Sequence, residues 1–148
     1  MKQTILKTFT LVFLVLVTGL VNAEELKNLS VEQVEALQKK GDALIIDVRT
    51  EQEWKQSGII PNSKPLQFFD KQGHANAKQW LAKLQQLKSS PDQPVVLVCR
   101  SGNRSGMVGR FLTENVGMKN VSHLSTGIQS WIKAGKPVAP VCNNQPNC

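Results

Sequence analysis

One short segment combines a cysteine with two arginines and a glycine. The thiolate form of cysteine is the nucleophile, and nearby positive charge favours that form. Arg100 and Arg104 place such charge close to Cys99, while Gly102 allows the backbone to curl tightly around an anion. The polar side chains of the segment can bind the loop or a substrate. The residues that follow Cys99 in the predicted anion-binding loop are Arg100, Ser101, Gly102, Asn103 and Arg104.

The segments on either side of this loop predict how Cys99 is positioned. Residues 94–99 are almost entirely apolar, which is typical of a strand buried on both faces. A helix is predicted from about Ser105 to Asn115, and the first N–H groups of a helix favour an anion. The thiolate can therefore form near neutral pH without a histidine base. We expect His74 and His123 to have no link to the loop and His123 to be structural.

Strands and helices alternate along the rest of the chain, which predicts an α/β domain with a mostly parallel sheet. Ser30 with Gln33 and Thr50 with Glu53 form two capping boxes at predicted helix starts. Ligands of such sheets bind beyond the carboxyl ends of the strands, where Cys99 lies. The predicted helices are 26–40, 50–56, 75–88 and 127–134, and the other predicted strands are 43–48, 121–124 and part of 61–69.

The first 23 residues have the three-part pattern of a secretory signal peptide. Lys2 and Lys7 precede an apolar run, and Ala23 provides a small residue for cleavage. The run is too short for a typical membrane-spanning helix, although an uncleaved anchor is the alternative. We therefore expect a periplasmic protein without stable membrane association after cleavage.

The charge of the chain is positive but not concentrated. Loss of Lys2 and Lys7 with the signal peptide would lower the formal net charge from +7 to +5. The remaining basic residues form no dense block, so the sequence does not indicate nucleic-acid binding. A positive surface does attract small anions. The length of 148 residues suits one domain, and a monomer is the default expectation.

The remaining cysteines lie in a polar tail, residues 142–148. Cys142 and Cys148 can form a disulfide in an oxidising compartment. Alternatively, one of them resolves a disulfide or persulfide on Cys99. The chain has no metal-ligand spacing and no nucleotide-binding loop, so we expect no metal and no other cofactor.

Three blocks of the sequence resemble the rhodanese family in the order that the family has them. The resemblance implies a three-layer fold over residues 24–141, with a small, mostly parallel sheet flanked by helices. Ile59 stands where many members have His, and Asn62 where many have Gly, which affects substrate preference more than the fold. The matching blocks are residues 45–63 (with Asp47, Arg49, Glu53 and Trp54), 99–105 and 127–138.

The resemblance also implies a reaction. Cys99 would take a sulfane sulfur from an anionic donor such as thiosulfate and pass it, as a persulfide, to cyanide or a thiol. The N–H groups of residues 100–104 would stabilise the anion, Arg100 would attract the donor, and Arg104 would hold the loop and assist the substrate pocket. Asp47, Arg49 and Glu53 would brace this end of the sheet, with Arg49 paired to an acid such as Glu53.

Two other functions compete with sulfur transfer. Phosphatases and arsenate reductases with a related loop place the arginine one residue later, whereas only four residues separate Cys99 from Arg104 here. A sulfur-binding or thiol-redox module with little turnover is the second rival. Such modules often lack the cysteine that this chain retains.

Overall fold

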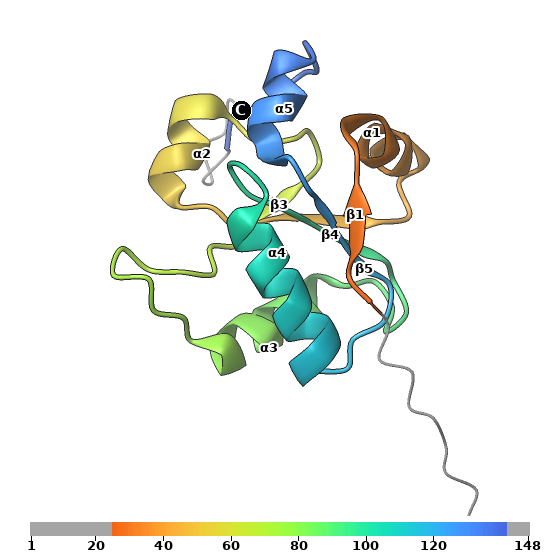
Figure 1. Ribbon diagram of the computed structural model, residues 1–148, viewed down its shortest axis with the longest axis vertical. Helices are drawn as coiled ribbons and strands as arrows, with labels where there is room; N and C mark the ends of the chain where they lie inside the picture. Colours follow the sequence, from red (N-terminus) through yellow and green to blue (C-terminus); the bar gives the residue numbers. More distant parts are fainter. Residues whose placement is uncertain (1–24, 142–148) are drawn as a thin grey trace, which may run out of the picture.

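A parallel β-sheet forms the centre of the computed structural model, which describes residues 25–141. The predicted signal peptide, Cys142 and Cys148 lie outside these residues. Within them, the sheet has five strands in the order β1-β5-β4-β2-β3, and every neighbouring pair is parallel (Figure 1). This arrangement confirms the predicted α/β fold. The strands are β1 (Lys27–Leu29), β2 (Leu44–Asp47), β3 (Lys64–Pro65), β4 (Val95–Val98) and β5 (Val121–Leu124).

Helices cover both faces of the sheet and produce three layers (Figure 1). A π-helical turn, Phe111–Asn115, continues the helix that follows the cysteine loop. No helix within residues 25–141 is long and apolar enough to span a membrane. The α-helices are α1 (Val31–Lys40), α2 (Glu51–Ser57), α3 (Ala77–Leu87), α4 (Asn103–Arg110) and α5 (Gly127–Lys133).

The alternation of side chains along the strands creates two apolar cores. Leu97 of β4 packs with Trp80 of α3 and Val108 of α4 on one face. Val96, its neighbour, packs with Trp131 of α5 on the other face, which α1 also covers. Because both faces are buried, the strands are almost continuously apolar, as the sequence predicted.

Both predicted capping boxes are present. At the start of α2, the Glu53 N–H donates to Thr50 Oγ1 over 3.4 Å, and the Thr50 N–H donates to Glu53 Oε2 over 3.1 Å. The Ser30 and Gln33 pair does the same for α1. These contacts place the Glu53 carboxylate at the N-terminus of α2, on the side that faces the cysteine loop.

The prediction of a helix from residue 26 is wrong for its first turn. Residues Lys27–Leu29 form an edge strand instead, and the helix begins at Val31, after the Ser30 cap. The strand pairs in parallel with β5, where Asn28 is opposite His123. The β5 edge would otherwise expose its backbone hydrogen-bonding groups, and β1 satisfies them.

Candidate active site

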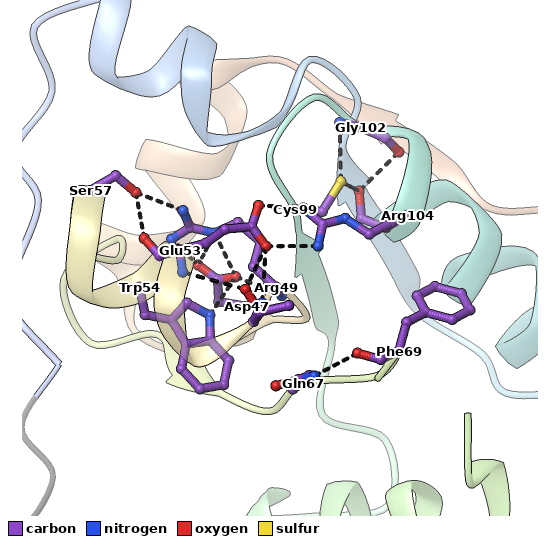
Figure 2. A network of polar contacts seen from close by, with 12 residues as sticks. Asp47, Arg49, Glu53, Trp54, Ser57, Gln67, Phe69, Cys99, Gly102 and Arg104 are labelled. Carbon is purple, nitrogen blue, oxygen red and sulfur yellow. Dashed lines mark hydrogen bonds and ion pairs between the residues drawn. The ribbon is translucent and has the colours of Figure 1, made fainter. Parts of the chain in front are cut away.

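Cys99 directly follows β4, and its side chain lies inside the loop that its own segment forms (Figure 2). The residue is only 1% exposed, and it is a free thiol among the described residues. The Gly102 N–H donates to Cys99 Sγ over 3.1 Å, and Ser105 Oγ lies 3.3 Å from the same sulfur. Both groups can donate hydrogen bonds to an anionic sulfur.

The loop returns to the sulfur through a turn at Gly102 that only glycine accommodates easily. Its φ is +97°, and a Cβ at this position would lie 1.8 Å from the Ser125 carbonyl oxygen. The Gly102 carbonyl then accepts the first hydrogen bond of α4, from the Gly106 N–H over 2.9 Å. The positive end of the α4 dipole therefore lies next to Cys99, as predicted.

The start of α5 holds the other side of the loop. The Ile128 N–H donates to the Cys99 carbonyl over 2.8 Å, and the Gln129 N–H donates to the Arg100 carbonyl over 3.2 Å. These bonds use N–H groups that have no acceptor within the helix. Residues 127–138, the third of the matching blocks, therefore include residues that bind the backbone of the cysteine loop.

Arg104 connects the loop to α2. Its Nη1 and Nη2 donate to the two carboxylate oxygens of Glu53 over 2.8 and 2.5 Å (Figure 2). Burial alone would raise the pKa of Glu53, but the hydrogen bond from Arg104, the hydrogen bonds within the Thr50 cap and the charge of Arg104 together lower it to about 2. Arg104 therefore ties the cysteine loop to α2.

Arg49 pairs with an acid, as the resemblance implied, but this acid is not Glu53. Arg49 instead binds Asp47, with Nε 2.9 Å from Oδ1 and Nη2 2.7 Å from Oδ2. Both residues are almost completely buried, and the Trp54 indole N–H donates to Asp47 Oδ1 over 3.0 Å. Arg49 also donates hydrogen bonds to Ser57 Oγ and to the Gly58 carbonyl, each over 2.7 Å. This cluster fixes α2 to the end of β2, which supports the side chain of Glu53.

Arg100, Ser101 and Asn103 are exposed on the outer side of the loop, and Arg100 lines a cavity of about 370 Å³. The α5 residues Gln129 and Ile132 form another part of its wall. A cavity of this size is ample for a small inorganic anion. Arg49 and Glu53 also line this cavity, but Arg49 is buried and Glu53 is acidic, so Arg100 is the exposed cation that can meet an anion from solvent.

The expectation that His123 has no link to the loop is wrong. His123 Nδ1 lies 3.1 Å from Ser105 Oγ, the same oxygen that contacts Cys99 Sγ. His123 is in β5, beside β4, so its side chain reaches the start of α4. The order of residues contains no signal for this contact, because it depends on the register of two strands.

A family model described as the Rhodanese-like domain matches residues 30–134. The thiosulfate sulfurtransferase GlpE of Pseudomonas savastanoi pv. phaseolicola is 33% identical over 107 residues, which are 72% of this chain and 88% of that protein. The protein of the same name from Pseudoalteromonas translucida is 29% identical over 105 residues, 71% of this chain and 88% of the relative.

Solved structures show the same fold. The polysulfide-sulfur transferase homodimer of Wolinella succinogenes has a TM-score of 0.61 at 22% identity, with 83% of this chain and 85% of that chain covered. A Rhodopseudomonas palustris protein described as a possible tyrosine phosphatase has a TM-score of 0.59 at 24% identity, with 77% and 85% covered. At these identities the likeness shows the fold alone.

Proposed function

Because the chain belongs to the rhodanese-like family, we propose that it is a thiosulfate sulfurtransferase that carries sulfur as a persulfide on Cys99. The observation that carries the proposal is the hydrogen bond of 3.1 Å from the Gly102 N–H to Cys99 Sγ, at the positive end of α4. A sulfur in this setting is stabilised as an anion. Relatives named as sulfurtransferases support the same reaction class.

In the first step, the Cys99 thiolate attacks the outer sulfur of thiosulfate. A bond forms between Sγ and that sulfur, while the S–S bond of thiosulfate breaks and sulfite leaves with the electron pair. The product is a persulfide anion on Cys99. The Gly102 N–H and the first N–H groups of α4 are the donors that would stabilise its charge.

In the second step, cyanide or a thiolate attacks the outer sulfur of the persulfide. The bond between Sγ and this sulfur breaks, and Cys99 leaves as the thiolate with which the cycle began. Thiocyanate or a new persulfide is released.

The two arginines have different tasks in this proposal. Arg100 is exposed at the cavity and raises the local concentration of the anionic donor. Arg104 faces Glu53 with both terminal nitrogens, so its guanidinium is committed to holding the loop. This commitment also weighs against phosphatase activity, which would require the loop arginine to grip a phosphoryl group.

The distinguishing experiment is an assay of purified protein with two substrate pairs. With thiosulfate and cyanide, we expect thiocyanate from the native chain and none from Cys99→Ser. With p-nitrophenyl phosphate, we expect no release of phosphate from either. Phosphate release that depends on Cys99 would replace the proposal with a phosphatase, and no turnover of either pair would favour a sulfur-binding module.

We propose further that the protein acts in the periplasm, after cleavage behind Ala23. The supporting observation is the charged, apolar and small-residue pattern of residues 1–23. Expression of the full chain with recovery from the periplasm, followed by mass measurement, tests this: the expected first residue is Glu24. The same mass shows whether Cys142 and Cys148 have lost two hydrogens as a disulfide.

A further inference from the structure

A chain of three polar side chains leads from Cys99 to the protein surface. Ser105 Oγ on α4 is 3.3 Å from Cys99 Sγ and 3.1 Å from His123 Nδ1 on β5. His123 Nε2 is 2.6 Å from Asn28 Oδ1 on β1, which is exposed. Because a carbonyl oxygen only accepts hydrogen bonds, the ring donates through Nε2 and presents the lone pair of Nδ1 to Ser105.

The surroundings of His123 favour the neutral form of its ring. The ring is 6% exposed and lies against α4 at Gly106, where an added Cβ would be 3.3 Å from Cε1 and 3.7 Å from an Arg110 nitrogen. Burial, followed by the charge of Arg110, lowers the pKa of His123, and a hydrogen bond with the Gly102 backbone opposes this shift. With Nε2 donating to Asn28, Nδ1 of the neutral ring is the acceptor that faces Ser105.

We propose that Cys99 passes its thiol proton to His123 through the Ser105 hydroxyl. The S–H bond of Cys99 breaks as a new O–H bond forms on Ser105, and the original O–H bond breaks as an N–H bond forms at Nδ1. Negative charge remains on sulfur and positive charge appears on the imidazole. This inference rests on the proposed function, because it explains how the thiolate for that reaction forms.

Before the transfer the Ser105 hydroxyl donates to His123 Nδ1 in place of the Gly102 carbonyl, which lies 3.1 Å from the same oxygen, and after it the hydroxyl donates to the sulfur. The ring then donates from Nδ1 to Ser105, and Ser105 donates to the sulfur anion, while the bond from Nε2 to Asn28 is retained. Only the direction of two bonds is reversed. A relay with this property avoids the cost of an unpaired buried polar group.

The relay also provides a route for the proton out of the buried site. Cys99 is 1% exposed, whereas His123 lines a cavity of about 610 Å³ together with Asn28 and Arg110. The lowered pKa of the ring means that it releases the proton to this cavity more readily than an ordinary histidine does. His123 is thus a positioning residue, since it acts on Cys99 through Ser105.

The test is the rate of Cys99 alkylation by iodoacetamide at pH 7 and pH 10, which needs no sulfur donor. We expect His123→Gln to lower the rate about tenfold at pH 7, because glutamine accepts no proton, and to leave the rate at pH 10 unchanged. At pH 10, hydroxide removes the thiol proton directly. The matched control is His74→Gln, at an exposed histidine, which should match the native chain at both values.

Two further variants test the proton relay even if His123→Gln alters the fold. Asn28→Asp, on the exposed edge strand, places a carboxylate beside Nε2, stabilises the imidazolium and should raise the rate at pH 7 about threefold. In Ser105→Ala, which interrupts the relay, adding His123→Gln should lower the rate no further.

The alkylation rates test the proton relay, whereas the production of thiocyanate tests the sulfurtransferase activity. A loss of equal size at pH 7 and pH 10, or an unchanged rate in Asn28→Asp, would overturn the relay even if the protein makes thiocyanate. The expected alkylation pattern in a protein that makes no thiocyanate would support the relay and contradict the proposed function.

Discussion

Gly127, the first residue of α5, lies so close to Arg100 that a Cβ on Gly127 would be 2.2 Å from the Arg100 carbonyl oxygen. The same added atom would be 2.4 Å from the Ser101 nitrogen. Since the next two N–H groups of α5 donate to Cys99 and Arg100, this contact fixes the backbone of the cysteine loop. The close approach leaves no room for a side chain.

Gly127→Ala should therefore damage the loop as well as the stability of the fold. The alanine would have to displace backbone atoms, and the position has a φ of +69° that alanine disfavours. Overpacking typically costs about 1–3 kcal/mol and the left-handed conformation about 1–2 kcal/mol. We expect kcat/KM for thiosulfate to fall at least tenfold.

Gly135→Ala is the matched control, because Gly135 has the same φ of +69° but nothing within 4 Å of an added Cβ. It should lose stability in thermal unfolding but keep its kcat/KM. Equal losses of activity in the two variants would show that the conformation of the glycine matters and that the contact with Arg100 does not.

Glu53→Gln should weaken the contact between α2 and the cysteine loop. It should also change how the free energy of unfolding depends on pH. The folded-state pKa of Glu53, about 2, is below its ordinary value of 4.5, so the folded chain binds this proton less readily than the unfolded chain does. The stabilisation is therefore complete above about pH 4.5 and is lost as the pH falls toward 2. Urea unfolding across this pH range measures the stabilisation as a change in the free energy of unfolding.

Relative to the native chain, Glu53→Gln should be less stable at pH 7 and approach the native stability near pH 2. Glu51→Gln is the control, because Glu51 is in the same turn of α2 but forms an exposed pair with Lys55. If the difference in the free energy of unfolding between Glu53→Gln and the native chain does not change with pH, the lowered pKa of Glu53 is not the source of the stabilisation.

Asp47→Leu should destabilise the fold strongly. Removal of Asp47 leaves the buried Arg49 without its carboxylate partner and the Trp54 indole without an acceptor. Breaking a buried ion pair by removing one partner typically costs about 3–5 kcal/mol. Urea unfolding at pH 7 checks this, with the exposed Asp42→Leu, which loses only a contact with Lys40, as the control. Similar midpoints for the two variants would refute a bracing role for Asp47.

Arg100→Gln should slow the reaction with an anionic donor without changing the fold. The guanidinium is exposed at the cavity, so its loss removes attraction for thiosulfate. We expect kcat/KM to fall about tenfold and to depend less on ionic strength, because screening acts on this charge. Lys78→Gln, an exposed change on α3, should keep the native salt dependence. An unchanged salt dependence in Arg100→Gln would exclude this role.

The local parts of the site were predictable from sequence. The apolar strand before Cys99, the glycine turn and the helix start lie in one continuous segment, and each has a known local signal. The capping box that positions Glu53 was predictable for the same reason. Such features depend on neighbouring residues and not on the arrangement of distant strands.

The partners across the fold were not predictable in the same way. Arg49 lies two residues from Asp47 and four from Glu53, so sequence separation alone does not decide that it binds Asp47 while Glu53 binds Arg104. The link of His123 to Ser105 requires β5 to lie beside β4 in its observed register. The strand β1 has three residues, too few to show alternation, and it is defined by its pairing with β5.

Intact mass measurement before and after incubation with thiosulfate shows whether Cys99 carries sulfur. We expect the native chain to gain the mass of one sulfur atom, to lose it again on addition of cyanide, and the Cys99→Ser chain to gain nothing. A chain with Cys142 and Cys148 both changed to serine should behave like the native one. A native chain that gains no sulfur, or a Cys99→Ser chain that still gains it, would rule out Cys99 as the sulfur carrier.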